Sequence, residues 1–336
     1  MRTSLTSIAC LGGLLGHAVM AQTPTDSPSP AQVVETMEQL NGITPGARRN
    51  HVVGVCASGY FVGNPKVQAY SRSPLFSGER IPVVARFSLA GGNPKAPDTA
   101  RSPRGLALAL RVSENQVQHF TLLNVPVFGA AQPQTFYEAL LAAKPDPATG
   151  KPHPEAQKTF LATHPDAQPL AQFMASHNPP ASYAQSDFYG IHTFKLINAQ
   201  DEAQLVRWRF EPSLGVLRLS DEEMKTRPSR FLEQDLQARL SQGPLHWQMV
   251  LTLGQADDEQ HNPTVRWPQN RPEIQAGELT LTASSPEVSA EGKGPCTQIN
   301  FDPLVMSDGV APTDDPILLF RSPAYANSYV KRLTGQ

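Results

Sequence analysis

The sequence has few charged residues and no excess of either sign. Charged residues make up 17% of its 336 residues, and 28 Lys and Arg against 30 Asp and Glu leave a formal net charge of −2. It contains no basic block and no interleaving of basic with aromatic residues, which are features of nucleic-acid-binding proteins. Composition therefore offers no support for a nucleic-acid partner.

Several motifs of catalysis and metal binding are also missing. The chain has no His-Glu-x-x-His, no paired Cys-x-x-Cys, no Cys-x-x-Cys-His and no Gly-x-Ser-x-Gly. These absences argue against a zincin, a zinc-ribbon or thiol redox protein, a covalently attached haem and an α/β-hydrolase. Gly91-Gly92 lacks the lysine and hydroxyl residue of a phosphate-binding loop, so it predicts a turn.

No apolar run is long enough for a typical transmembrane helix. The first residues combine a basic Arg2 with a short apolar stretch from Ile8 to Met20 and small residues before Gln22. A membrane span needs about 20 apolar residues, so this pattern favours a secretory signal peptide over residues 1–21. Residues 22–32 are rich in Thr, Ser and Pro and are predicted to form a disordered N-terminus of the mature protein.

Cysteine is scarce, with three residues in the whole chain. Cys10 lies within the predicted signal, which leaves Cys56 and Cys296. In an oxidising compartment these two could pair, but two cysteines so far apart in sequence are weak support for a bridge. Cys56 lies in an apolar run, so we expect a buried free thiol, with the pair as the alternative.

What the chain does have is proline, 32 residues, together with 23 glycines and many short apolar runs. These runs are typical of strands in an antiparallel sheet or barrel, and no internal repeat is visible. We therefore expect a single α+β domain built on a β-barrel. The predicted strands are residues 51–61, 81–88, 105–112, 118–127, 190–198, 202–212, 245–254 and 279–284; the predicted helices are 33–41, 135–143, 154–177 and 326–333, the last started by Pro323.

Two short segments carry the functional prediction. Arg48-Arg49-Asn50-His51 offers an imidazole beside arginines, and Arg321-Ser-Pro-Ala-Tyr325 sets an arginine and a tyrosine four residues apart. On a helix the second pair shares one face. A phenol titrates near pH 10, so a phenolate at neutral pH needs a nearby cation or a metal. Tyrosine is a rare axial ligand of haem iron, and with a histidine on the other side of the haem it indicates peroxide chemistry.

Further segments resemble those of haem catalases, in the same order. They run from about residue 34 to the C-terminus: His51–Phe61, Ala85–Ser88, Asp98–Gly105, Leu123–Phe128, Ile191–Asn198, Arg266-Trp-Pro, Gln298–Pro303 and Arg321–Leu333. The chain ends just after the last segment, whereas full catalases continue into a wrapping segment and a helical domain. It thus resembles the secreted bacterial catalase-related peroxidases, the minimal catalase fold. The resemblance implies a catalase-like antiparallel β-barrel with surrounding helices over residues 33–336, without the C-terminal helical domain.

The resemblance implies a catalytic set of His51, Asn124 and Ser88. A neutral His51 imidazole would move a proton between the two peroxide oxygens, an effect usually worth about 10²–10⁴ in rate. Asn124 would donate a hydrogen bond to the peroxide, and the Ser88 hydroxyl would orient the imidazole. Outside this resemblance, a histidine beside an arginine is more often a surface residue, and Asn124 and Ser88 suit a turn and a strand.

The resemblance also implies haem b, bound non-covalently, with Tyr325 as its iron ligand. Arg321 would hold the Tyr325 oxygen in its charged form by a charge-assisted hydrogen bond. Arginine forks suit carboxylates and keep their charge. The remaining haem-binding set matches positions that pair with the propionates or pack on the porphyrin: Arg48, Arg86, Arg332, Phe128 and Phe136. Taken singly, each arginine is better explained by a solvated charge, and each phenylalanine is explained equally well by an ordinary core aromatic.

Three departures from full catalases shape the predicted reaction. Asn50 replaces an apolar channel valine, Ser102 replaces an aspartate that orients hydrogen peroxide, and residues 129–133 differ from the usual sequence. A wider, less selective channel favours peroxidase turnover of hydrogen or organic peroxides with an external electron donor. The alternatives are a true catalase, a haem or hydrophobic-ligand carrier without catalysis, and an enzyme that rearranges fatty-acid hydroperoxides.

The expected partners are a peroxide and an electron donor that the sequence does not identify, with no nucleic acid. We expect a bacterial periplasmic or secreted protein that has no membrane attachment after signal cleavage. A monomer or small homo-oligomer is expected.

Overall fold

The computed structural model describes residues 27–146, 149–150, 153–290 and 292–335. The predicted signal peptide and residues 22–26 of the segment predicted to be disordered lie outside these residues. Within them, no helix is both long and apolar enough to span a bilayer. The strands are β1 (Val53–Gly63), β2 (Arg80–Leu89), β3 (Arg104–Arg111), β4 (Val117–Leu123), β5 (Phe188–Ile197), β6 (Ala203–Pro212), β7 (Leu245–Leu253), β8 (Glu273–Pro286), β9 (Val288–Ser289), β10 (Gly292–Lys293) and β11 (Val310–Pro312).

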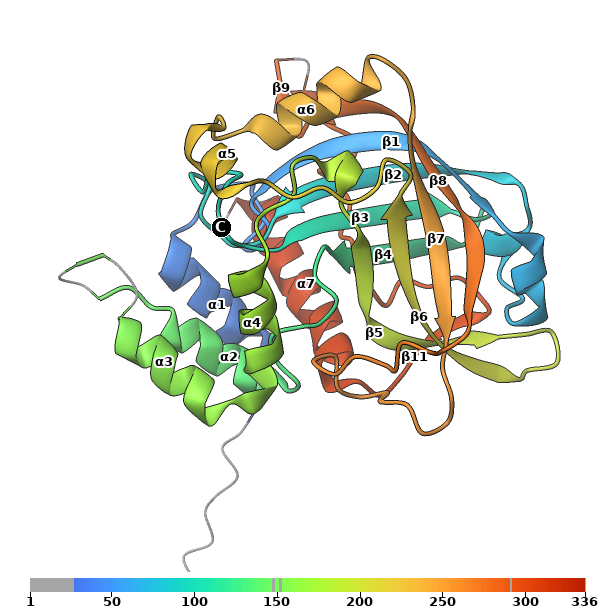
Figure 1. Ribbon diagram of the computed structural model, residues 1–336, viewed down its shortest axis with the longest axis horizontal. Helices are drawn as coiled ribbons and strands as arrows, with labels where there is room; N and C mark the ends of the chain where they lie inside the picture. The colour runs from blue at the N-terminus through green and yellow to red at the C-terminus, as the bar shows by residue number, and fades with distance from the viewer. Residues whose placement is uncertain (1–26, 147–148, 151–152, 291, 336) are drawn as a thin grey trace, which may run out of the picture.

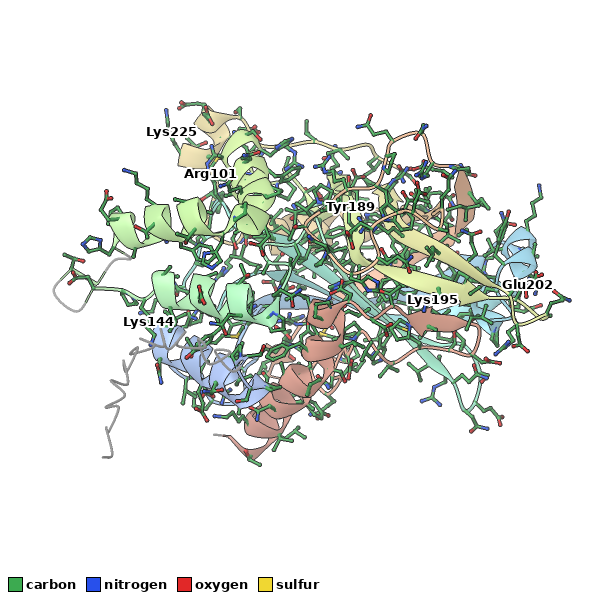
Figure 2. All side chains as sticks on the ribbon, turned by 90° about the horizontal axis from the view of Figure 1, so that it is seen from below. Arg101, Lys144, Tyr189, Lys195, Glu202 and Lys225 are labelled. Carbon is green, nitrogen blue, oxygen red and sulfur yellow. A yellow bond between two sulfur atoms is a disulfide. The ribbon has the colours of Figure 1, made fainter. Side chains whose placement is uncertain are left out.

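The longer helices lie mainly against one side of these strands (Figure 1). The helices are α1 (Pro30–Asn41), α2 (Pro133–Ala142), α3 (Pro154–Thr163), α4 (Gln168–Ser176), α5 (Asp221–Thr226), α6 (Phe231–Leu240) and α7 (Pro316–Thr334), with 3₁₀ turns at Pro65–Ala69, Pro74–Phe76, Pro165–Ala167 and Tyr183–Gln185. Figure 1 shows α1 and α2 beside α7, and α6 above β1. In Figure 2, Lys144 follows α2 on the helical side of the molecule, while Glu202, between β5 and β6, lies at the opposite end.

The main sheet closes into an antiparallel barrel, as expected. Its nine strands follow the order β11-β5-β4-β3-β2-β1-β8-β7-β6, and a further pairing of β5 with β6 completes a ring of eight, with β11 added to β5. Each strand from β1 to β8 is hydrogen-bonded to the next in sequence, and β1 also pairs with β8. Closure leaves no exposed edge within the ring.

Alternation along the strands separates two environments. Val55, Ala57 and Phe61 of β1 point into the barrel, where Phe87 and Trp247 are also fully buried. The intervening positions point outward because successive side chains of a strand face opposite sides. Cys56 of β1 belongs to a separate cluster with Cys296 and Phe301, against which Ala107 of β3 packs. The functional side chains on β1–β4 share this outer face.

The main differences from the expected elements follow from capping. Helix α7 begins at Pro316 after an Asp315 cap, so Pro323 lies inside the helix and does not start it. Helix α1 begins at Pro30 because Ser29 and Gln32 form a capping box, so residues 30–32 are helical, although they were included in the segment predicted to be disordered.

Other helix and strand boundaries also differ from the expected ones. The helix expected over residues 154–177 is broken at His164–Pro165 into α3 and α4, since Pro cannot continue the helical hydrogen bonding. Strand β8 is much longer than the run expected at 279–284, and α5 and α6 were not predicted.

The expectation of a free Cys56 thiol is wrong. Cys56 and Cys296 form a disulfide with 5.4 Å between their Cα atoms and 240 residues between them in sequence. Both side chains are fully buried. Sequence spacing gave no signal for this pair because only barrel closure brings the two segments together.

Replacing both cysteines by alanine should lower the free energy of unfolding by about 2–4 kcal/mol, since the bridge restricts the unfolded chain. Denaturant titration of the Cys56→Ala/Cys296→Ala variant against the wild type measures this difference. A thiol reductant serves as the control: it should bring the wild type toward the variant and leave the variant unchanged. Equal midpoints for the oxidised wild type and the variant would contradict the expected contribution.

Candidate active site

The floor of the site is a patch of small residues on the outer face of the barrel. One row across the sheet pairs Gly54 with Ser88 and Ser88 with Gly105. The next row pairs Cys56 with Arg86, Arg86 with Ala107 and Ala107 with Thr121. A Cβ added at Gly105 would lie 2.6 Å from Ser88 Oγ and 3.1 Å from the His51 ring. Glycine at position 105 is therefore required for these two side chains to meet.

Above this floor lies a cavity of about 210 Å³. Helix α7 forms the opposite wall, and α1 closes one end with Val33, Val34 and Met37. Glu38 ties α1 in place through contacts with Arg49 (2.5 Å) and Lys331 of α7 (2.8 Å). The lining includes nine of the ten residues predicted for the site: His51, Ser88, Arg48, Arg86, Phe128, Phe136, Arg321, Tyr325 and Arg332.

His51 is held in an unusual backbone conformation, with φ of 56°. A residue other than glycine rarely adopts positive φ, and such strain persists where neighbours enforce it. The Asn50 side-chain oxygen accepts from the His51 backbone N–H (2.9 Å), and Arg86 Nη2 donates to the His51 carbonyl (2.8 Å). His51 Nδ1 and Ser88 Oγ share a hydrogen bond of 2.9 Å, which leaves Nε2 as the nitrogen available to a ligand.

The His51 imidazole is neutral at physiological pH. Burial, together with the positive charges of Arg86, Arg321 and Arg48, lowers its pKa to about 3. A neutral imidazole can accept a proton at one nitrogen while the other stays bonded to Ser88. This is the electrostatic state that a proton-accepting histidine requires.

Asn124 lies at the margin of the cavity, next to the lining residue Leu123, and does not itself line it. Its side chain is buried, and its amide oxygen accepts from the backbone N–H of Arg104 (2.7 Å). The Asn124 backbone N–H in turn donates to the Arg104 carbonyl (2.8 Å). These bonds fix the orientation of the amide, with its NH₂ group at the other end.

Tyr325 belongs to a partly buried chain of hydrogen bonds that starts on α7. Arg321 Nη2 donates to the Tyr325 hydroxyl (2.8 Å) and to Thr121 Oγ1 (2.8 Å). Arg321 Nη1 is 2.9 Å from His192 Nε2, and His192 Nδ1 is 2.6 Å from Asp315 Oδ2. Arginine can only donate, so His192 accepts at Nε2. Its own proton is therefore on Nδ1, which donates a hydrogen bond to Asp315.

His192 and Asp315 were not predicted from the sequence. His192 lies in the segment Ile191–Asn198 that matched the family, but no role was assigned to it. Burial lowers its pKa, against the opposing effect of Asp315. The available signal was the position of Asp315 before Pro316, six residues ahead of Arg321: a helix cap beneath the Arg–Tyr pair.

Three arginines form a buried positive cluster at one end of the cavity. Arg48 Nη2 donates to the carbonyls of Cys296 (3.2 Å) and Ile299 (2.9 Å), while its Nε is buried without a partner among the described residues. Burial and the charges of Arg86 and Arg332 lower the pKa of Arg48. Such a cluster favours an added negative charge.

Arg86, another member of this cluster, already has partners within the protein. Its Nε and Nη2 donate to the two carboxylate oxygens of Glu287 (2.7 and 2.8 Å). Arg332 donates weakly to the Ile299 carbonyl (3.3 Å). The rings of Phe128 and Phe136 also line the cavity and stack with centroids 5.7 Å apart. The flat floor, the stacked rings and the arginine cluster together suit a flat apolar ring system that carries carboxylates at one edge.

The two channel departures both have local hydrogen-bonding roles. Asn50 also accepts from the Gly91 N–H (2.7 Å), and Ser102 Oγ donates to the Ala90 carbonyl (2.8 Å). Asn50 lines the cavity and Ser102 does not. In the divergent stretch at 129–133, the Ala131 N–H donates to Asp166 Oδ2 (2.8 Å), so this segment is joined to the turn between α3 and α4.

Comparison with known sequences gives a consistent result. The family model of catalase matches residues 29–336. The catalase-related peroxidase of Synechococcus elongatus is 50% identical over 329 residues, spanning 98% of this chain and 96% of that protein. The catalase-related peroxidase of Mycolicibacterium paratuberculosis is 30% identical over 310 residues, spanning 91% of this chain and 95% of that protein. The catalase of Glandirana rugosa is 30% identical, but this chain spans only 55% of it.

Solved structures support the fold. A fungal catalase has a TM-score of 0.78 at 24% identity, with 96% of this chain and 66% of that chain covered. A bacterial catalase has a TM-score of 0.78 at 22% identity, with 99% and 68% covered. At these identities the likeness concerns the fold alone.

The low pKa of His51 should make the stability of the protein depend on pH. Between the ordinary value of 6.5 and the folded value of about 3, the unfolded chain binds a proton that folded His51 does not. The wild type therefore loses stability as the pH falls through this window. His51→Gln should remove about 2 kcal/mol of the loss between pH 7 and 5, since one pKa unit is about 1.4 kcal/mol.

Denaturant titrations of the haem-free protein at pH 7 and pH 5 measure this difference. His246→Gln is the control, because His246 contacts Glu278 on the barrel and does not line the cavity. It should retain the wild-type pH dependence. If His51→Gln also retains it, folded His51 binds its proton in the ordinary range.

Proposed function

Since the chain belongs to the catalase family, we propose that it is a haem peroxidase that reduces hydrogen peroxide or organic peroxides with electrons from an external donor. It is an oxidoreductase that acts on peroxide, like the catalase-related peroxidases it resembles. One observation carries the finer assignment: a neutral histidine just before β1 and an arginine-bound tyrosine from α7 line the same cavity.

The residues of the cavity fit haem b. The Tyr325 oxygen would be the iron ligand, and the Arg321 N–H bond would stabilise it as an anion. Arg48 and Arg332, with the remaining N–H group of Arg86, would receive the propionates, and Phe128 and Phe136 would pack against the porphyrin. Arg48 Nε, buried without a partner in the described part of the chain, supports a carboxylate at this edge. When bound, haem iron supplies the two-electron reduction of the peroxide bond.

The protein moves the proton that this reduction requires. His51 Nε2 would take a proton from one peroxide oxygen and return it to the other, which departs as water or an alcohol. Ser88 holds Nδ1 and so keeps Nε2 turned to the cavity. Because its oxygen is bonded to Arg104, Asn124 would use its NH₂ group to donate to the peroxide.

The departures at Asn50 and Ser102 support peroxidase turnover over hydrogen peroxide disproportionation. Both side chains bond backbone groups, so neither places a charge on the approach to His51. An approach without a charged residue selects less strongly for hydrogen peroxide than one that ends in a carboxylate. Larger peroxides are then acceptable substrates.

We also propose that the protein works in the bacterial periplasm or outside the cell. The N-terminal signal pattern supports export, and the Cys56–Cys296 disulfide is typical of an oxidising compartment. The electron donor and the monomeric or small oligomeric state stay predictions.

Steady-state kinetics at equal peroxide concentration test the reaction type. Protein supplied with haem should oxidise a one-electron donor at least several times faster than it evolves oxygen, because the channel does not favour a second hydrogen peroxide. Oxygen electrode and donor absorbance recordings measure the two rates. Faster oxygen evolution would identify a true catalase, and conversion of a lipid hydroperoxide to a rearranged product without donor oxidation would identify a rearranging enzyme.

Replacing His51 by alanine should lower the second-order rate constant for peroxide by about 10²–10⁴, the usual contribution of a general acid–base group. Haem binding should persist, because the Tyr325 side of the cavity is unchanged. Stopped-flow absorbance and the haem content of the purified variant measure both properties. His246→Ala is the control. Undiminished peroxide reactivity in His51→Ala would show that His51 is not the acid–base group, whereas a wild type that binds haem without reacting with peroxide would identify a carrier.

A further inference from the structure

The carboxylate of Glu287 binds a member of the arginine cluster, although the sequence did not predict it as a site residue. Glu287 follows β8 directly, and its side chain is 19% exposed. Both of its oxygens bind Arg86, one to Nε at 2.7 Å and the other to Nη2 at 2.8 Å. This two-point geometry fixes the plane of the guanidinium as well as its place.

The same guanidinium reaches the backbone of His51. Arg86 Nη2, which binds Glu287, also donates to the His51 carbonyl at 2.8 Å. A Cβ at Gly54 would lie 2.4 Å from Nη2, so β1 is shaped to let Arg86 lie across it. His51 is at φ 56°, and a non-glycine residue keeps that conformation only while its neighbours hold it there. Arg86 is one of those neighbours.

The disulfide holds the segment that carries Glu287. Cys56 lies directly opposite Arg86 in the β1–β2 pairing, and its bridge attaches Cys296 to the same point of the barrel. Between Glu287 and Cys296 the chain forms the β9–β10 hairpin, closed by the Gly294 N–H donating to the Glu287 carbonyl (2.8 Å). Both ends of the hairpin contact the arginine cluster: Glu287 binds Arg86, and the Cys296 carbonyl accepts from Arg48.

Charge gives a second reason why Arg86 stays in place. Arg48, Arg86 and Arg332 repel one another. This repulsion lowers the pKa of Arg48 and Arg332, and the negative charge of Glu287 opposes that lowering. Removing one partner of a buried ion pair leaves the other charge uncompensated. Without Glu287, Arg86 would therefore tend to move away from the other two arginines and from His51.

We propose that Glu287 is a positioning residue for His51: it binds Arg86 in the orientation in which that arginine holds the His51 carbonyl, and the disulfide-anchored hairpin keeps Glu287 there. This inference rests on the proposed haem peroxidase function. Glu287 touches neither peroxide nor haem in this role. The segment between β8 and Cys296 therefore also helps to determine the orientation of the His51 imidazole.

Glu287→Gln in the full-length, haem-loaded protein tests the role, with Glu273→Gln as its matched control. Glu273 lies on β8 and also binds an arginine through both oxygens, Arg209 at 2.6 and 2.8 Å, but it does not line the cavity. Cyanide is the probe, because hydrogen cyanide must lose its proton to a distal base as it binds ferric haem. Its association rate reports His51 without turnover, and stopped-flow absorbance also gives the peroxide rate constant.

Glu287→Gln should lower both rate constants about tenfold or more, with haem content and the Soret spectrum unchanged, since the Tyr325 side is untouched. Glu273→Gln should stay within about twofold of the wild type. Glu287→Asp, which keeps the charge on a shorter side chain, should recover part of the loss. Equal cyanide rates in Glu287→Gln and Glu273→Gln would overturn the proposal.

A double-mutant cycle with Arg86→Lys decides whether Glu287 acts through Arg86. Lysine keeps the charge but lacks the fork that binds Glu287 and the His51 carbonyl together. The two substitutions should then be non-additive, with the double variant no slower than the slower single variant. Additive losses would refute the route through Arg86. Should Glu287→Gln fail to fold or to hold haem, Glu287→Asp carries the cycle.

Failure of this proposal differs from failure of the proposed function. If the wild type binds no haem, or does not react with peroxide once loaded, the function is wrong. If the wild type reacts and only the Glu287 variants match the control, the positioning role alone is wrong.

Discussion

The site depends on the alternation of side chains in the first four barrel strands. Because odd-numbered positions of β2 fill the barrel, Arg86 and Ser88 must point outward, and pairing with β1 and β3 sets them beside Cys56, Ala107 and Gly105. A one-residue slip of register would bury these polar groups in the core and move the apolar ones into the site. Barrel closure prevents such a slip, so the packed interior determines the layout of the chemistry outside it.

Helix α7 supplies the opposite wall through a different kind of control. Its Asp315 cap accepts from the backbone of Ile317 and Leu318 through one oxygen and binds His192 through the other. The helix start is thus joined to β5, and the series of hydrogen bonds continues from His192 through Arg321 to Tyr325. The Asp315 carboxylate both caps the helix and orients His192, so the position of Tyr325 depends on a partly buried hydrogen-bond network.

Electrostatics gives the two sides different characters. The barrel side holds a neutral His51, whose charged form is disfavoured by burial and by Arg86, Arg321 and Arg48. The arginine end holds more positive charge than Glu287 offsets, which favours a bound carboxylate ligand. Arg48 and Arg86, which would receive the haem propionates, add to the effect of burial in lowering the pKa of His51.

Much of this arrangement could be predicted from residue types and local spacing. The Arg321–Tyr325 pair shares a helix face because the two are four residues apart, and His51, Ser88 and the arginines line the cavity as the family resemblance implied. Element boundaries were less predictable where caps decide them. Asp315 and Pro316 outweighed Pro323 as a helix start, and Pro165 divided one expected helix into two.

The sequence by itself determined which groups were available: an imidazole, a phenol, several arginines and the strand periodicity that separates a core face from a site face. Only the tertiary structure decided which of them meet. The Arg86–Glu287 pair, the Arg321–His192 pair and the Cys56–Cys296 bridge join residues 201, 129 and 240 positions apart. No local pattern records such contacts, because they exist only after barrel closure has brought those strands and loops together.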